Sequence, residues 1–376
     1  MKRHIRRLTR KGYATIAKPL LFKQLPDTVH HRLIQVGKVI QRIPAVSEAP
    51  RLWSHQSPRL ETTVAGVRFR NPIGLSAGFD KNVDMVPIMR GVGFGFMTGG
   101  SVTALPCNGN PRPWFYRLPQ SHSLVVHAGL PNQGVERVVQ RIVKYPKRMF
   151  IDFPLSVSVA KTNSKETVSD SEAIDDYCTS LRRLKEENAG QMYEINISCP
   201  NTYGGQPFTT PDRLDGLLTM VDQIQLDKPL FIKMPISQPW RELRGLLEVI
   251  LRHRVQGVAI GNLLHTRDKS KLKDELPDSV KGNLSGEPTR QISTELIRKT
   301  YLEYGDKLAI IGIGGVFTAE DAFEKIRAGA SLVALITGMI FEGPQVVGDI
   351  NAGLEQLLGD NGFASVSEAV GTGAKK

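Results

Sequence analysis

The sequence predicts an α/β protein, a (β/α)8 TIM barrel preceded by an N-terminal helical extension. Eight short apolar runs follow one another over about 290 of the 376 residues, and a helical pattern or a helix-sized segment follows each run. The composition, 40% hydrophobic and 23% charged with a mean hydropathy of −0.19, excludes a disordered chain and a polytopic membrane protein. A doubly wound sheet is the rival fold, but eight consecutive units favour closure.

The apolar runs and the helical patterns between them give the expected elements in order. The runs lie at 73–77, 94–98, 155–159, 193–197, 230–233, 257–260, 309–313 and 332–336. Helical patterns include those at 171–187, 211–224, 239–252, 291–304, 318–328 and 344–358.

The positive charge of the chain is concentrated at its N-terminal end. Residues 1–42 hold eleven Lys and Arg and one acid, Asp27, so they account for +10 of the formal net charge of +12. Such asymmetry predicts an arm that meets an anionic surface, either membrane headgroups or nucleic acid.

Apolar residues in this head recur at helical spacing. Val29, Leu33, Val36, Ile40 and Ile43 are separated by four, three, four and three residues, which predicts an amphipathic helix beginning near Asp27 or Thr28. A shorter apolar face precedes it and is expected to break at Pro19, so the head is predicted to be a hairpin of two short helices. The chain is accordingly divided into a head at 1–43, a linker at 44–61 and the barrel at 62–376.

Neither a membrane span nor a disulfide framework is expected. The longest apolar run, about 331–341, is well short of the roughly 18 residues that a spanning helix needs. The three cysteines, Cys107, Cys178 and Cys199, are far apart and are expected to be reduced thiols. No His, Cys or carboxylate spacing predicts a metal site, and the scattered histidines, including His30 and His127, are interpreted as structural or surface residues.

Polar residues stand at the end of nearly every expected strand, where a barrel carries its functional groups. Lys233 closes an apolar run and is suited either to a Schiff base or to stabilising an anion. Cys199 is a candidate proton acceptor or nucleophile. The glycines of 312–315, together with Thr337 and Gly338, are typical of a phosphate cradle. Three asparagines, Asn196, Asn201 and Asn262, suit a planar ligand with alternating donors and acceptors.

Taken together, these strand ends resemble the dihydroorotate dehydrogenases, particularly their membrane-associated class 2. The resemblance covers nearly the whole chain and rests on long, ordered motifs: KPLLF at 18–22, NPIGLSAGFDKN at 71–82, PRPWFYRL at 111–118, NISCPNT at 196–202, LSG at 284–286, IGIGG at 311–315 and TGMIFEGP at 337–344.

The resemblance implies an FMN enzyme that oxidises dihydroorotate to orotate in pyrimidine synthesis. Cys199 would remove the proton from C5 while hydride passes from C6 to flavin N5. Lys233 would lie beside the flavin ring as the second catalytic residue. The substrate would be held by Lys81, near its carboxylate, and by Asn196, Asn201 and Asn262.

The resemblance also implies which residues contact FMN and where the enzyme works. The expected FMN contacts are Ala77, Gly78, Ser101, Lys233, Ser285, Gly286, Gly314, Gly315, Thr337 and Gly338. The head would dock on an anionic membrane surface and admit a membrane quinone, with Arg117 near the quinone tunnel. We therefore expect a peripheral protein on the cytoplasmic side of a cell membrane, such as a bacterial inner membrane, that binds no nucleic acid; no obligate protein partner is inferred.

Four features depart from the class 2 pattern. Cys199 stands where class 2 enzymes carry a serine base. A cysteine at this position is typical of the soluble class 1 enzymes. Val126 replaces an asparagine that contacts orotate, and Leu263 replaces the hydroxyl residue after the substrate asparagine. Ser158 and Thr162 stand where flavin-contacting asparagines are usual.

Three alternative functions remain open from the sequence. The Val126 and Leu263 changes favour another FMN-dependent barrel oxidoreductase, with a different dihydropyrimidine-like substrate or a soluble electron acceptor. Lys233 would suit a Schiff-base lyase that needs no flavin. The basic head would also suit a non-catalytic membrane- or nucleic-acid-binding protein on a degenerate barrel.

Overall fold

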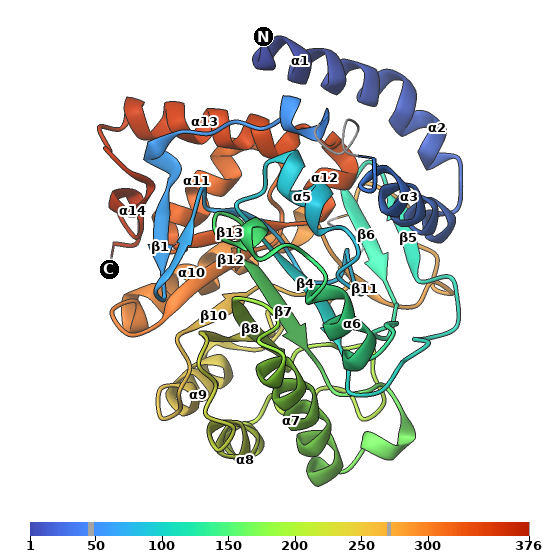
Figure 1. The fold of residues 1–376 in the computed structure, drawn as a ribbon, viewed down its shortest axis with the longest axis vertical. Coiled ribbons are helices and arrows are strands. Elements are labelled where there is room, and N and C mark those ends of the chain that lie inside the picture. The colour runs from blue at the N-terminus through green and yellow to red at the C-terminus, as the bar shows by residue number, and fades with distance from the viewer. Residues whose placement is uncertain (44–48, 269–271, 376) are drawn as a thin grey trace.

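The protein is described by a computed structural model that covers residues 1–43, 49–268 and 272–375. Within these residues, eight parallel strands close into a barrel in the order β10, β12, β13, β3, β4, β7, β8, β9 (Figure 1). Every one of them overlaps an apolar run named above, so the predicted (β/α)8 barrel is confirmed. The strands are β3 Ile73–Leu75, β4 Phe96–Val102, β7 Leu155–Val159, β8 Met192–Asn196, β9 Leu230–Met234, β10 Gly257–Ile260, β12 Ala309–Ile313 and β13 Leu332–Leu335.

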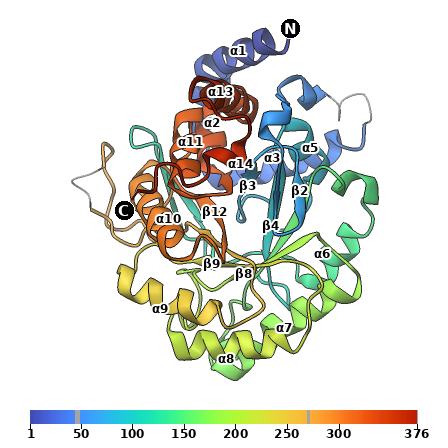
Figure 2. The same cartoon turned by 90° about the vertical axis from the view of Figure 1, so that its left-hand side faces the viewer.

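The helices surround the strands, and Figure 2 shows them as a ring around the barrel. Their apolar faces cover the outer side of the barrel, while Ser and Thr residues begin several of them; Thr318, for example, forms a capping box with Asp321 at the start of α11. The main helices are α5 Val86–Val92, α6 Val135–Ile142, α7 Asp170–Glu186, α8 Pro211–Asp222, α9 Trp240–Ile250, α10 Arg290–Tyr304, α11 Ala319–Ala328 and α13 Val346–Asp360, with the shorter α12 Thr337–Glu342 and α14 Val366–Ala369.

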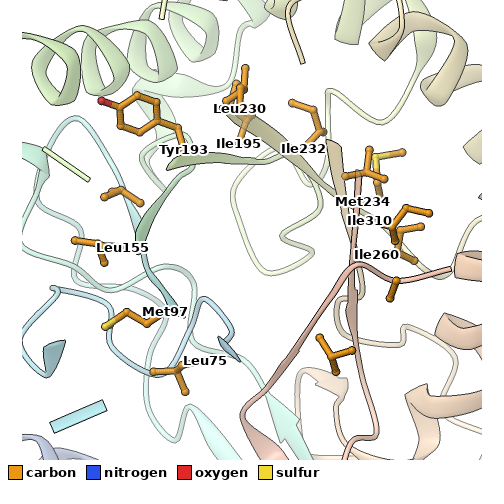
Figure 3. Packing of buried hydrophobic residues seen from close by; sticks show 14 of the residues in the cluster. Leu75, Met97, Leu155, Tyr193, Ile195, Leu230, Ile232, Met234, Ile260 and Ile310 are labelled. Atoms are coloured by element: carbon orange, nitrogen blue, oxygen red, sulfur yellow. The ribbon is translucent and has the colours of Figure 1, made fainter. Parts of the chain in front are cut away.

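Alternate residues of each strand face the inside of the barrel. Phe231 and Ile311 belong to the inner cluster, whereas their neighbours Ile232 and Ile310 belong to the larger core between strands and helices (Figure 3). This alternation follows from the two-residue repeat of a strand. It decides which polar residues at the strand ends can reach the interior.

Two small sheets that the sequence analysis did not predict cover the ends of the barrel. The hairpin of β1 Thr62–Val64 and β2 Val67–Phe69 adds to the inner cluster, where the rings of Phe69 and Phe96 meet edge to face at 5.4 Å. A three-stranded antiparallel sheet joins β5 Phe115–Leu118, β6 Ser123–Val126 and β11 Asn283–Leu284. The second sheet lies at the other end of the barrel and borders the cavity found there.

The head contains the expected hairpin, but its first arm does not break at Pro19. Helix α1 Lys2–Gly12 continues through one π-helical turn, Tyr13–Ala17, into α2 Lys18–Phe22. Because the π turn shifts the hydrogen-bonding pattern just before the residue that lacks an N–H, the helix can pass the proline. The prediction of a break was therefore wrong. The second arm, α3 Pro26–Ile40, begins beside Asp27 as predicted.

Helices α1 and α3 of the head lie against the barrel (Figure 1), and specific polar contacts fasten the head there. On α1, the buried Arg6 pairs with Asp349 of α13 at 3.0 Å. The Tyr13 hydroxyl donates to the Ile340 carbonyl at 2.6 Å, and its burial raises its pKa to about 12, so it remains a donor. A head held in this way has a defined position over one side of the barrel.

The described part of the segment expected to be a linker packs against the barrel. Residues 44–48 of the predicted 44–61 lie outside the described residues. The remainder forms two 3-10 turns, Ala49–Leu52 and Pro58–Leu60, and Leu60 is fully buried. In the described part of the chain, no helix combines the length and the apolar character needed to cross a bilayer.

Candidate active site

A cavity opens at the carboxyl ends of the barrel strands and encloses about 1240 Å³ when its mouth is included. In a (β/α)8 barrel this is the end that carries functional residues. All the candidate site residues named from the sequence line this cavity: Ala77, Gly78, Lys81, Ser101, Asn196, Cys199, Asn201, Lys233, Asn262, Ser285, Gly286, Gly314, Gly315, Thr337 and Gly338. The structure thus brings together residues that are up to 261 positions apart.

Lys233 reaches the cavity because of its position on β9. It follows the inward-facing Phe231 by two residues, so its side chain also points inward. Only 6% of Lys233 is exposed. Its Nζ atom makes no hydrogen bond or ion pair with any residue that the structure describes. Because burying an amine without a partner is costly, this position is suited to an electron-rich or anionic group bound beside it.

Ser198 links two of the expected substrate asparagines. The Asn262 side chain donates to the Ser198 carbonyl at 2.7 Å and to its hydroxyl at 2.5 Å. The Ser198 hydroxyl and backbone N–H in turn donate to Asn196 Oδ1, at 3.3 and 3.2 Å. Asn196 Nδ2 then donates to the Ser101 hydroxyl at 2.9 Å. This directional chain of hydrogen bonds fixes which end of each side-chain amide is the NH2 donor, and it holds the Asn196 and Asn262 side chains in place.

Asn201 ties the loop after β8 to the small sheet above the barrel. Its Nδ2 donates to the Val126 carbonyl on β6 at 3.0 Å. Its Oδ1 accepts from Asn283 of β11 at 3.2 Å and lies 3.3 Å from His127 Nδ1. The amide that is expected to hold the substrate is therefore oriented by residues from β6 and β11, and His127 takes part in this site rather than lying on the surface.

Cys199 is partly buried in the cavity wall beside two lysines. Burial raises the pKa of its thiol, while a hydrogen bond from the Asn201 backbone and the positive charges of Lys233 and Lys161 lower it. Lys161 is itself buried and donates to the Tyr203 carbonyl at 2.6 Å. A thiol in this setting can accept a proton only after losing its own, and the lysine charges favour that loss.

Lys81 supplies a cation at another part of the cavity wall. Its Nζ donates to the Gly78 carbonyl at 2.8 Å and lies 5.5 Å from the centre of the Phe115 ring. Burial lowers the pKa of Lys81 to about 8, although the carboxylates of Asp80 and Asp27 oppose that shift. At neutral pH most of the amine is still protonated, so it can pair with a carboxylate.

The residues expected to contact FMN fit a phosphorylated planar group. Gly314 and Gly315 after β12 take φ values of +112° and +64°, which favour glycine. A Cβ atom on Gly314 would lie 2.6 Å from the Thr289 hydroxyl oxygen, so only glycine fits at this position. The hydroxyls of Ser285 and Thr337 lie 3.1 Å apart on the same side of the cavity. Backbone amides and hydroxyls are suitable partners for a phosphate, and Lys233 for an electron-rich ring.

The two polar residues that replace flavin-contacting asparagines have different surroundings. Ser158 is fully buried and lies 2.9 Å from Ser101 through their hydroxyl oxygens, so it supports a residue of the cavity wall. Thr162 does not line the cavity. Its hydroxyl donates to the buried Asp176 at 2.5 Å, and that carboxylate also accepts the backbone N–H of Ala104. Thr162 therefore holds two loops together.

His30 is a cavity residue that the sequence analysis missed. It was interpreted as structural or surface, but it lines the cavity from helix α3 of the head. Its ring meets Phe79 and Phe115 at 5.4 and 5.7 Å. Burial and the charge of Lys81 lower the pKa of His30 to about 3, so the ring is neutral. No local pattern around His30 signals this contact, because it depends on how the head packs.

Comparisons with known proteins agree with this geometry. Residues 59–358 match the family model described as dihydroorotate dehydrogenase. Curated relatives named dihydroorotate dehydrogenase (quinone) include those of Synechocystis sp., 34% identical over 93% of each chain, and Haloarcula marismortui, 34% identical over 95% of this chain and 98% of the relative. The crystal structure of the Eimeria tenella enzyme in complex with ferulenol has a TM-score of 0.81 at 26% identity and covers 95% of this chain and 99% of its own. The chain therefore belongs to the dihydroorotate dehydrogenase family.

Proposed function

We propose that this chain oxidises dihydroorotate to orotate with FMN, in pyrimidine synthesis, and passes the electrons to a membrane quinone. The observation that carries the proposal is the cavity, where a buried amine without a partner, Lys233, lies with a cysteine, a second lysine and three oriented asparagines. The family match and the curated relatives, which are named quinone-dependent, support the same reaction.

The cofactor would be held by the glycines after β12 and by the hydroxyls of Ser285 and Thr337 at its phosphate, with Ala77, Gly78, Ser101, Gly286 and Gly338 completing the contacts. When bound, FMN supplies the two-electron oxidant that takes the C6 hydrogen of the substrate with its electron pair. Lys233 places a positive charge beside the ring and so favours electron density there.

The substrate would be held by charge at one end and by amides around its ring. Protonated Lys81 pairs with the carboxylate of dihydroorotate. Asn196, Asn201 and Asn262 face the alternating carbonyl and N–H groups of the ring, and their hydrogen bonds to the protein hold them ready. Such preorganisation reduces the entropy lost on binding and keeps C5 near the base.

Cys199 is the group that removes the C5 proton. As a thiolate it accepts the proton and becomes a thiol, and the lysines beside it help to regenerate the charged form. Because burial alone would keep the sulfur protonated, the nearby positive charges of Lys233 and Lys161 are part of its function as a base.

Quinone is proposed to reach the cavity from the side of the head. His30 of helix α3 and Phe115 of β5 form an aromatic part of the cavity wall. Arg117 stacks 4.6 Å over Phe22 and donates to the Gln24 carbonyl at 2.6 Å, so it fixes the turn between the two arms of the head. Neutral His30 can donate to a quinone carbonyl without adding a charge to an apolar passage.

Residues 1–43 are proposed to act as the membrane head, 44–61 as its linker and 62–376 as the FMN-binding barrel. The head exposes large apolar side chains among its basic residues, with Leu8 68%, Ile16 63% and Leu20 57% exposed. This combination is typical of a helix that lies at an anionic membrane interface. The proposed location is peripheral, on the cytoplasmic side of a cell membrane such as a bacterial inner membrane.

The test follows the colour of the cofactor. Purified protein should be yellow, dihydroorotate without oxygen should bleach it, and a soluble quinone should restore the colour. Flavin-loaded protein that stays oxidised with dihydroorotate would contradict the substrate and leave the fold unaffected. Reoxidation by fumarate or NAD but not by quinone would contradict the electron acceptor.

A second candidate is an FMN-dependent oxidoreductase for a less polar dihydropyrimidine. Val126 and Leu263 present apolar side chains in the cavity wall, where they offer a substrate no side-chain hydrogen bond. Bleaching by a panel of dihydropyrimidines that lack the carboxylate, faster than by dihydroorotate, would favour this candidate.

A further inference from the structure

A basic groove lies outside the active-site cavity, between the end of head helix α3 and helices α5 and α6. Its volume is about 1690 Å³ when its open mouth is included, and none of its lining residues lines the active-site cavity. Among the described residues that line it, seven are Lys or Arg, whereas Asp84 is the one with a carboxylate. The barrel as a whole is nearly neutral, so this concentration of positive charge is local.

The acids nearby neutralise only part of this charge. Lys38 and Arg141 both pair with Asp84, at 3.2 and 2.9 Å. Arg90 pairs with Asp152 at 3.0 Å. These contacts fix the walls of the groove, because they connect α3 and α6 to Asp84, between β3 and α5, and connect α5 to Asp152, just before β7.

Three further cations of the groove are exposed and have no acidic partner within the described chain. They are Arg42, just after α3, Lys144, in the turn after α6, and Arg148, in the 3-10 turn Lys147–Phe150. Guanidinium and ammonium groups that converge on one concave site are suited to phosphate oxygens, which accept several charge-assisted hydrogen bonds at once.

The surroundings of the groove favour a lipid as the source of that phosphate. The last turns of α3 present Lys38 and Gln41 to the groove. On the same turns, Val36 and Val39 are 53% and 59% exposed. The headgroup of a lipid fits the groove while its acyl chain lies along the exposed apolar side chains. A soluble phosphate compound would contact the groove and leave these apolar side chains exposed.

We propose that the basic groove binds the phosphate headgroup of an anionic phospholipid, with its acyl chains along the exposed apolar side of α3. The inference rests on the proposed membrane association and adds to it a defined headgroup site on the barrel. It predicts that charge lost from this groove weakens membrane binding more than the same charge lost elsewhere.

The test compares two variants of the full-length holoenzyme with equal net charge. Lys144→Gln with Arg148→Gln removes two exposed cations of the groove. The matched control, Arg182→Gln with Arg241→Gln, removes two exposed cations on α7 and α9, at the side of the barrel away from α1 (Figures 1 and 2). Sedimentation measures binding to phosphatidylcholine vesicles with and without phosphatidylglycerol, and calorimetry measures binding of inorganic pyrophosphate.

Wild type and control should bind phosphatidylglycerol vesicles more tightly than phosphatidylcholine vesicles. The groove variant should lose about five-fold per removed charge, or about 25-fold in all, on the anionic vesicles alone. Unchanged binding of the groove variant, or an equal loss in the control, would overturn the headgroup site while leaving membrane association intact.

Pyrophosphate binding that depends on Lys144 and Arg148, without any preference for anionic vesicles, would overturn the proposed lipid ligand in favour of a soluble phosphate compound. Failure of wild type to bind either vesicle would contradict the proposed membrane association itself, with bleaching by dihydroorotate as the separate check on catalysis.

Discussion

Asn196 and Lys233 are register partners on the neighbouring strands β8 and β9, so their side chains enter the cavity next to each other. One is an amide oriented by Ser198 and Ser101, and the other is a buried amine to which no described residue offers a hydrogen bond. The strand pairing of the barrel thus sets the expected substrate position, at Asn196, beside the expected cofactor position, at Lys233.

Replacing Lys233 with methionine should slow flavin reduction strongly while the protein stays folded. The change removes a buried positive charge beside the cofactor, and loss of one such electrostatic group typically costs about 100- to 1000-fold in rate. Anaerobic stopped-flow bleaching measures the effect, with the exposed Lys307→Met as the control. A rate equal to that of wild type would remove Lys233 from the reaction.

Replacing Cys199 with alanine should slow bleaching by about 100- to 10,000-fold, because a general base contributes about that much. In wild type the rate at saturating dihydroorotate should rise with pH, since burial raises the pKa of the thiol and only the thiolate accepts a proton. Cys199→Ser should shift that rise to higher pH. Cys107→Ala, which removes a buried thiol outside the cavity, is the control.

Dihydroorotate binding should weaken as the pH rises through about 8. Burial lowers the pKa of Lys81 to that value, and only the protonated amine pairs with the substrate carboxylate. Lys81→Met should weaken binding at neutral pH by about tenfold to a hundredfold, the usual loss for a hydrogen bond to a charged group. The half-saturating concentration for bleaching, measured across pH, checks both. A flat profile in wild type would contradict this role.

Ser198→Ala should reduce both stability and substrate affinity. The hydroxyl is buried between Asn196 and Asn262, and its loss removes one hydrogen bond to each, at a cost of about 0.5–1.5 kcal/mol per bond in the free energy of unfolding, while both amides keep their bonds to the Ser198 backbone. Urea unfolding of the holoenzyme gives the stability, and bleaching kinetics give a KM that rises more than kcat falls. If affinity stayed constant while stability fell, Ser198 would be structural only.

Val126→Asn combined with Leu263→Thr should improve dihydroorotate binding if dihydroorotate is the natural substrate. Each change offers one hydrogen bond in the cavity wall, worth about 0.5–1.5 kcal/mol. The half-saturating concentration for bleaching should fall accordingly. Weaker binding of dihydroorotate by the double variant would indicate that the apolar wall serves a different substrate. Val143→Asn, an exposed position, is the control.

Most of the barrel could be predicted from sequence because its signals are local. A strand such as β9 is a short apolar run, and the residue that follows the last inward-facing apolar side chain by two, Lys233, must point inward as well. Asn196 and Cys199 were placed at the carboxyl end of a strand because they end or follow an apolar run, and β8 ends at Asn196. Glycine-rich turns after β12 indicated a cradle for the same local reason.

Elements that depend on distant partners could not be predicted in this way. Strand β11 is two residues long, and it exists because Asn283 pairs with Val126, 157 positions earlier in the chain. The continuation of the head helix past Pro19 depends on a π-helical turn, and no pattern of residues in the sequence predicts such a turn.

The sequence by itself determined the barrel, the polar residues at its strand ends and the basic character of the head, because strand periodicity and residue type act over a few neighbouring positions. The wider set of residues around the cavity was implied by the resemblance to the dihydroorotate dehydrogenases. Only the tertiary structure decided that His30 of the head enters the cavity, that Ser198 orients two asparagines, and that cations from α3, α6 and the turn after it form one groove. These features arise when segments far apart in the chain pack together. The free energy of that packing depends on contacts between segments, so the residues of a single segment do not determine it.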